Sequence, residues 1–151
     1  AISLTATQQN FYLNAGNQTG STTSTVQLLA NNTESATYCY TVAVNITTNE
    51  FIYTVDSSTP ELTLSVTKSA AGASATSVLT NYDITTKTGT INIPTTLGGT
   101  VYKNSITAAA SATTTDSFTA TVSMVNLGTK QTANEGKNFS AKLVLTTVSC
   151  S

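Results

Sequence analysis

The stretch AISLTATQQNFYL (residues 1–13) has the strongest bearing on the fold. Ile2, Leu4 and Ala6 alternate with hydroxyl-bearing residues, and this period of two is typical of a half-buried β-strand. No Asn-Gly or similar hairpin signal joins this strand to the next one. We therefore expect an apolar strand that either folds back as an edge strand or inserts into the sheet of another molecule.

The second half of this stretch breaks the alternation. Phe11 and Leu13 are predicted to be further apolar contacts, and the change of phase predicts a bulge or kink at residues 8–10. The sequence leaves open whether Phe11 or Tyr12 points inward. Residues 14–25 (NAGNQTGSTTST) are predicted to form a polar tether, and residues 26–151 the folded domain.

The composition favours an all-β domain. The chain has 151 residues, which is the usual length of one domain. About a third of them are Ser or Thr, whereas the strong helix formers Glu, Lys, Gln and Arg are scarce. Short apolar runs with turn signals between them predict a β-sandwich of the immunoglobulin type.

Alternating residues define the expected strands of the sandwich. The expected inward faces take every second residue of segments 38–46, 51–55, 62–66, 118–124 and 139–145. Shorter strands are expected at 26–28, 78–82, 91–93 and 101–106. Small-residue loops are expected at 69–77 and 108–115, and a long exposed hairpin turn at 128–137.

Charge and hydropathy indicate a protein displayed outside the cell. Only 9% of the residues are charged and the net charge is −1, so no basic patch for nucleic acid is expected. No apolar run approaches the roughly 18 residues that span a bilayer. The first residue is Ala rather than Met, which predicts a removed signal peptide and an extracellular location.

The two cysteines predict one disulfide. Cys39 and Cys150 fall on the outward phases of their strands, which favours a bridge over two buried thiols. Two cysteines without any His cannot complete a zinc shell, so no metal is expected.

Catalysis has little support. The chain has no His, which removes the usual general base and any Ser-His-Asp triad. The acidic residues are expected to be solvated in turns and at strand ends: Glu34, Glu50, Asp56, Glu61, Asp83, Asp116 and Glu135. An internal Lys–Asn crosslink of the kind some surface pilins carry would draw on Lys68 or Lys142, but the outward phase of Lys142 argues against a buried crosslink there. We expect neither an enzyme nor a cofactor.

Four sequons accompany this composition. Their acceptor residues are Asn17, Asn31, Asn45 and Asn138. Chance alone gives a similar number in a chain this rich in Asn, Ser and Thr. Asn17 and Asn31 are placed in loops, and Asn45 and Asn138 on outward faces, where N-linked glycans would point into solvent.

Together these features resemble donor-strand-complemented pilins. The shared features are the alternating first strand, the polar tether and the Thr/Ser-rich sandwich. In its low charge, its sequons and its lack of His and Arg, the chain is similar to archaeal thread filament subunits. The resemblance implies an immunoglobulin-like, pilin-like β-sandwich with an N-terminal donor-strand extension. It also implies a glycosylated subunit of an extracellular filament, joined head to tail to identical copies. Ile2, Leu4 and Ala6 would then be the side chains of the donor strand that fill the groove of the next subunit. The assembled filament would serve adhesion or biofilm formation. A monomeric adhesin or carbohydrate-binding module remains the alternative.

Overall fold

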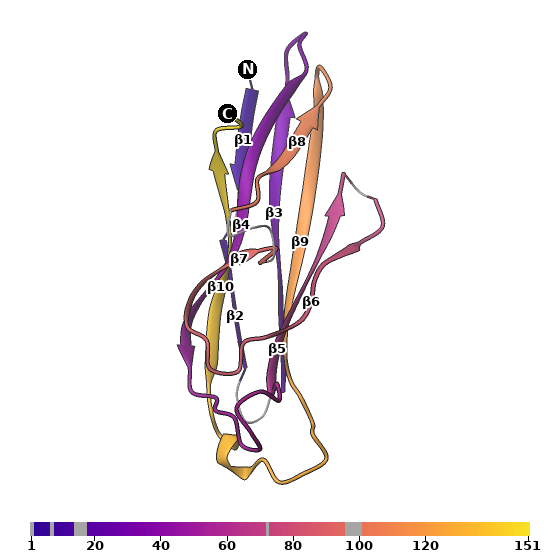
Figure 1. The fold of residues 1–151 in the computed structure, drawn as a ribbon. Coiled ribbons are helices and arrows are strands. Elements are labelled where there is room, and N and C mark those ends of the chain that lie inside the picture. The colour runs from indigo at the N-terminus through magenta and orange to yellow at the C-terminus, as the bar shows by residue number, and fades with distance from the viewer. Residues whose placement is uncertain (1, 7, 14–17, 72, 96–100) are drawn as a thin grey trace.

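The chain folds into two antiparallel β-sheets that pack face to face (Figure 1). The structure, a computed structural model, describes residues 2–6, 8–13, 18–71, 73–95 and 101–151. Among these residues the only helix is a single turn, Thr132–Asn134, so no described helix could cross a bilayer. This confirms the predicted all-β sandwich.

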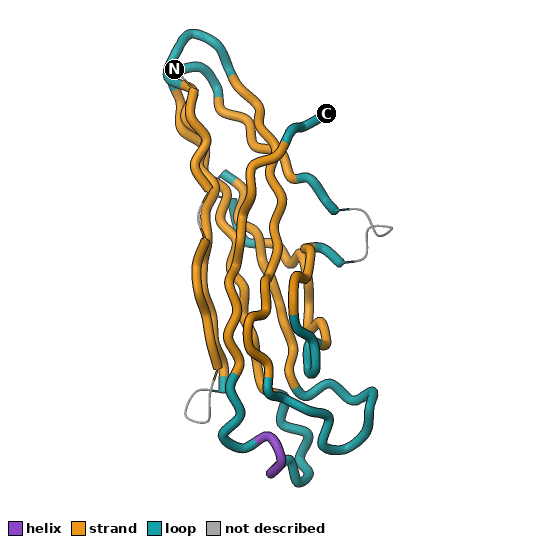
Figure 2. Tube along the Cα trace, turned by 90° about the vertical axis from the view of Figure 1, so that its left-hand side faces the viewer, coloured by secondary structure: helices purple, strands orange, loops and turns teal. Residues whose placement is uncertain are grey.

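Each sheet has its own set of strands. In spatial order, the first sheet contains β1 (Ile2–Ala6), β3 (Thr19–Ala30), β9 (Ala112–Met124), β5 (Leu62–Ala70) and β6 (Thr76–Asp83). The second contains β2 (Gln8–Leu13), β10 (Phe139–Val148), β4 (Ala36–Asn49) and β7 (Gly89–Ile93), with β8 (Asn104–Ala108) also paired to β4. Figure 2 shows the molecule elongated along the strands, with loops gathered at its lower end.

The strand order matches an immunoglobulin sandwich. β3 lies between β1 and β9, β9 pairs with β5, and β4 pairs with β10. The A, B, E and D strands of an immunoglobulin domain have the same order, and its C strand pairs with F in the same way. In the sequence, β6, β7 and β8 lie between the D-like strand β5 and the E-like strand β9. In space, β6 extends the first sheet beyond β5, and β7 and β8 extend the second sheet beyond β4.

Alternating side chains from both sheets form one core. On β10 the predicted inward residues are all buried, as are Phe118, Ala120 and Val122 of β9. In β4, Tyr40 to Ile46 follow the predicted alternation. Tyr38 does not: its side chain is 39% exposed, because β4 there extends to the upper end of the sandwich.

Several boundaries differ from the sequence-based prediction. Residues 19–25, expected in the tether, belong to β3. Residues 51–55 form a loop rather than a strand, and Val55 is 52% exposed. Half of the loop expected at 108–115, residues 112–115, lies inside β9, and residues 101–103 precede β8 rather than belonging to it. The segment 128–137 connects the two sheets, so it is not a hairpin turn.

Candidate functional site

The second part of the N-terminal strand, β2, lies along the edge of β10. The two strands are antiparallel, with Leu13 opposite Phe139 and Phe11 opposite Ala141. Phe11 and Leu13 are 3% and 1% exposed and belong to the hydrophobic core. The Phe11 and Phe139 rings pack with their centroids 6.2 Å apart. β2 therefore completes the core beside the last strand.

The structure resolves which aromatic of β2 points inward. Phe11 is buried, whereas Tyr12 is 61% exposed on the outer face. The Tyr12 backbone lies so close to β3 that a Cβ added at Gly20 would be 2.3 Å from the Tyr12 carbonyl oxygen. Only glycine fits at that position of β3 without a shift of the backbone. The glycine at position 20 of β3 therefore allows β2 to approach this closely.

The first part, β1, occupies a different edge. It pairs antiparallel with β3, with Ile2 opposite Ala30 and Ala6 opposite Val26. Leu4 and Ala6 are half-buried and pack against the core from its margin. The side chain of Ile2 lies outside the described part of the structure. β1 covers the edge of the first sheet more than it fills the core.

The predicted irregularity in this strand has a different cause from the one expected. No bulge interrupts residues 8–10, which pair continuously with β10 from Gln8 to Asn10. Instead the chain leaves the first sheet after Ala6 and enters the second sheet at Gln8. The change of sheet reverses which face is inward, and this explains the change of phase.

The place that β2 fills is normally filled by another strand. In an immunoglobulin sandwich the F strand lies between C and G, and G follows F in the chain. Here β10 lies between β4 and β2, so an N-terminal segment takes the position of G. It also runs antiparallel to its neighbour, as G does.

β2 covers only part of the β10 edge. The β2 pairing ends at Val144, whereas β10 continues to Val148. On that side the described residues provide no strand partner for 145–148. An open groove of about 520 Å³ lies there, lined by Leu4, Thr5, Ala6, Gln8, Val144, Leu145, Thr146 and Thr147. The upper part of the edge is therefore an open sheet margin.

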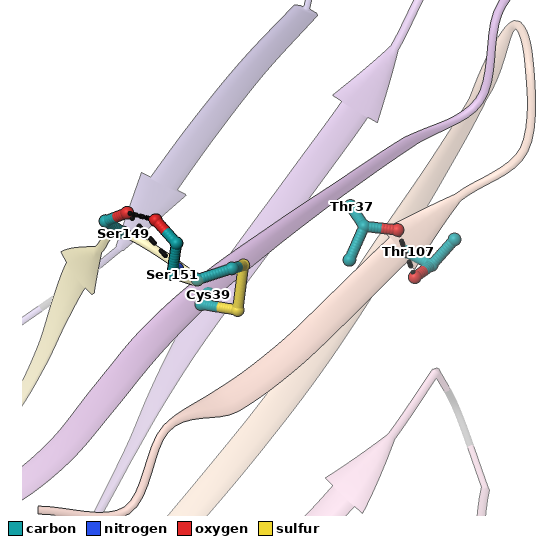
Figure 3. The surroundings of a disulfide bond; sticks show 6 residues. Thr37, Cys39, Thr107, Ser149 and Ser151 are labelled. Carbon is teal, nitrogen blue, oxygen red and sulfur yellow. Dashed lines mark hydrogen bonds between the residues drawn. A yellow bond between two sulfur atoms is a disulfide. The ribbon is translucent and has the colours of Figure 1, made fainter.

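The predicted disulfide is present at this upper end. Cys39 of β4 is bonded to Cys150, and their Cα atoms are 5.1 Å apart (Figure 3). The Thr37 and Thr107 hydroxyls, also labelled in Figure 3, are 2.8 Å apart between β4 and β8. The bridge fastens the C-terminal end of β10 to β4, where β2 no longer pairs with it.

The sequons within the described residues lie on the surface. Asn31 is exposed in the turn after β3, and Asn138 is exposed one residue before β10 rather than within it. Asn45 is half-exposed in the middle of β4. Asn17 lies outside the described residues. The placement of the described three suits glycosylation, which stays a prediction.

Two acidic side chains are buried, contrary to the prediction that all are solvated. Glu61 is fully buried and accepts hydrogen bonds from the Thr54 hydroxyl at 2.6 Å, from Gln131 at 2.9 Å and from the Thr54 N–H. Burial alone would raise the pKa of Glu61, but these hydrogen bonds outweigh it and hold the pKa below its ordinary value. Glu61 therefore holds together the loops at the lower end.

The second buried acid is Asp116 of β9, which is 3% exposed and accepts a hydrogen bond from the Tyr40 hydroxyl. It lies on the same phase as Phe118 and Ala120, so its inward position could have been read from the alternation. Within the described part of the chain, no three His, Cys, Asp or Glu side chains gather to share a metal ion.

Comparison with known proteins places the chain in no family. No protein-family model matches the chain, and no curated protein matches it. Among solved structures, one match is the carbohydrate-binding module TmCBM61 in complex with β-1,4-galactotriose. It covers 99% of this chain and 82% of that chain, at 9% identity and a TM-score of 0.36. A likeness this weak carries no argument about function, and the chain is best described as a β-sandwich of immunoglobulin topology.

Proposed function

We propose that this protein is a structural subunit of an extracellular surface filament. In the filament, the N-terminal strand of one molecule pairs with β10 and β3 of the next. One observation carries the proposal: β2 takes the position of the G strand and places Phe11 and Leu13 in the core. A sandwich whose last strand comes from the start of the chain can take that strand from a neighbour.

The physical basis is that exchange conserves contacts. The same pairs of residues meet whether the strand belongs to its own molecule or to another one. Removing β2 would expose the apolar face of β10 and its unpaired backbone groups, and both are satisfied by an incoming strand. Donation from each molecule to the next does not close on itself, so it produces a filament.

The surface supports an extracellular setting. A disulfide persists in oxidising compartments. Exposed or half-exposed sequons at Asn31, Asn45 and Asn138 leave room for glycans that would keep a weakly charged polymer soluble. The partner is another copy of the same chain, and adhesion or biofilm formation is the role of the assembled filament.

The second candidate is a monomeric adhesin or carbohydrate-binding module. Exposed tyrosines favour it, because sugars stack on aromatic rings, and Tyr12, Tyr38 and Tyr102 all face solvent. Ser140 of β10 pairs with Tyr12 on one side and with Thr48 of β4 on the other. Thr48 is ten residues along β4 from Tyr38. At about 3.3 Å per residue, the rings of Tyr12 and Tyr38 are roughly 30 Å apart and cannot serve one small ligand. We therefore favour the filament.

Complementation in trans tests the proposal. A chain that lacks residues 1–13 is titrated with a synthetic peptide of those residues, and the melting temperature is followed. We expect an unstable truncated chain that the peptide rescues. A peptide carrying Phe11→Asp should not rescue it, whereas the matched peptide carrying Tyr12→Asp should. A truncated chain that is a stable monomer and ignores the peptide would contradict the proposal.

A further inference from the structure

A lysine, an asparagine and an aspartate from three strands meet between the sheets. The Lys68 Nζ lies 3.2 Å from the Asn104 Oδ1 and 3.9 Å from the Asp116 Oδ2. Lys68 is on β5 and Asp116 on β9, both in the first sheet, whereas Asn104 is on β8 of the second sheet. The three side chains therefore connect the two layers of the sandwich.

Their surroundings are largely closed to water. Asn104 and Asp116 are 6% and 3% exposed. The Lys68 amine lies over the Phe118 ring, 5.6 Å from its centroid, and Tyr40 packs edge-on against the same ring. The side chain of Lys68 is 23% exposed, so the site keeps some contact with solvent.

The aspartate is held in a fixed orientation. Its Oδ2 accepts the Tyr40 hydroxyl at 2.7 Å and its Oδ1 accepts the Ala71 N–H at 3.2 Å. Burial and the Asp116 carboxylate raise the pKa of Tyr40, so the phenol stays a donor. Both Asp116 oxygens thus accept a hydrogen bond, and Oδ2 also lies on the side of the Lys68 amine.

The distances do not fit a simple ion pair. A direct ammonium–carboxylate bond measures about 2.7–2.9 Å, yet the amine is 3.9 Å from Asp116 and closer to the neutral amide of Asn104. A carbonyl carbon lies about 1.2 Å from its oxygen, so the Asn104 Cγ is within about 4.5 Å of the amine. A small side-chain shift would bring it to the roughly 3–3.5 Å of a near-attack geometry.

We propose that Lys68 and Asn104 form an isopeptide bond with the assistance of Asp116. The Asp116 carboxylate takes one proton from the Lys68 ammonium, and the neutral amine attacks the Asn104 Cγ. The protonated Asp116 polarises the carbonyl oxygen and gives its proton to the leaving nitrogen. The restored carboxylate then takes the second proton from the attacking Nζ and releases it to solvent when Asp116 ionises again. The new Nζ–Cγ bond forms, the Cγ–Nδ2 bond breaks and ammonia leaves, so no oxidant or cofactor is consumed.

This bond would complement the disulfide. The disulfide joins β4 to the end of β10 within the second sheet, whereas the isopeptide bond joins β5 to β8 across the sheets. It closes a loop between residues 36 positions apart. A subunit with both bonds resists separation of its layers when a load is applied, whether it works as a filament subunit or alone.

Mass spectrometry of the full chain tests the proposal. The chain is made in a host without N-glycosylation, its disulfide is reduced, and its intact mass is measured. We expect a mass about 17 Da below the sequence value, because one ammonia is lost. Loss of ammonia at an asparagine can also leave a cyclic imide, so tandem mass spectrometry must show one branched peptide that joins residues 68 and 104.

Variants assign the deficit to these residues. Lys68→Arg and Asn104→Ala should each restore the full mass, and Asp116→Asn should restore it while conserving the side-chain volume. The matched control is Lys87→Arg, whose lysine lies over the Tyr82 ring instead and which should keep the deficit. Wild-type protein at full mass overturns the proposal whatever the variants do. A deficit that persists in Lys68→Arg would also overturn it.

Discussion

β1 and β2 are consecutive parts of one N-terminal strand, yet they interact with the molecule in different ways. β2 places Phe11 and Leu13 in the core beside β10, where both are almost fully buried. β1 leaves Leu4 and Ala6 half-buried at the margin of the first sheet. Similar apolar alternation therefore leads to different depths of burial. The apolar side chains of β2 fill the core, whereas those of β1 cover the edge of a sheet.

The largest effect is expected for Phe11→Ala. Truncating a fully buried phenylalanine removes its burial energy and leaves a cavity against Phe139, at a cost of about 3–5 kcal/mol. Urea denaturation of the purified chain measures this loss. Tyr12→Ala on the outer face of the same strand is the control and should change stability by well under 1 kcal/mol. Equal effects at the two positions would contradict the assignment of Phe11 as a side chain that fills the core.

Loss of the disulfide should come next. Cys39→Ser with Cys150→Ser should lower the free energy of unfolding by about 2–4 kcal/mol, because the bridge closes a loop between residues 111 apart. Hydrogen exchange should rise at residues 145–148, which have no partner on the β2 side, and less at 140–144, which pair with β2. Uniform exchange along β10 would show that β2 does not hold its lower part.

Gly20→Ala should displace β2 while leaving both cysteines and the apolar core side chains unchanged. The added Cβ would meet the Tyr12 carbonyl, so the backbone of β2 must move away from β3, at a cost of about 1–3 kcal/mol. Amide exchange should increase in β2 and stay unchanged in β1. Thr19→Ala, at an exposed neighbouring position, provides the control. A Gly20→Ala chain with fully protected β2 amides would refute the close approach of the two strands.

The smallest effect is expected for Leu4→Ala. Because Leu4 is only half-buried, its truncation should cost about 1 kcal/mol, less than a core leucine. The same denaturation series measures it beside Phe11→Ala. If Leu4→Ala were as harmful as Phe11→Ala, β1 would also fill the core and the contrast between the two parts would disappear.

The sandwich core could be predicted because burial of one sheet face imposes a period of two. Residues 42–46 and 139–145 show that period clearly, and in both stretches every second residue is buried as expected. The same rule misled at residues 51–55, where Phe51 is buried but Val55 is exposed in a loop. There the Glu61 hydrogen bonds fix the loop, and no alternation in sequence encodes them.

The start of β3 could not be predicted from apolar residues, since residues 19–25 contain none. Their pairing with β9 depends on backbone bonds and on hydroxyl contacts, such as Thr23 with Thr119 at 2.9 Å and Ser21 with Thr121 at 3.2 Å. A Thr-rich strand and a polar tether have the same polarity. The β-propensity of Thr is the only signal that separates them.

The position of β2 could be predicted from the sequence only in part. The apolar stretch and its break were visible, but the change of sheet and the choice of Phe11 over Tyr12 depend on tertiary packing. Lys68, Asn104 and Asp116 each lie on the inward phase of their strands. A polar residue on a core phase was the available signal, but three separate strands had to be placed before it had meaning.

Crosslinking across the β2–β10 pair tests most directly whether β2 passes between molecules. Asn10 and Lys142 are register partners, and opposite residues in an antiparallel pair have Cα atoms about 4.5–5.5 Å apart, which a disulfide can span. A chain carrying Asn10→Cys and Lys142→Cys is assembled, oxidised and run on a denaturing gel without reductant. Strand exchange predicts a ladder of covalent multimers. A single band of internally bridged monomer would contradict it.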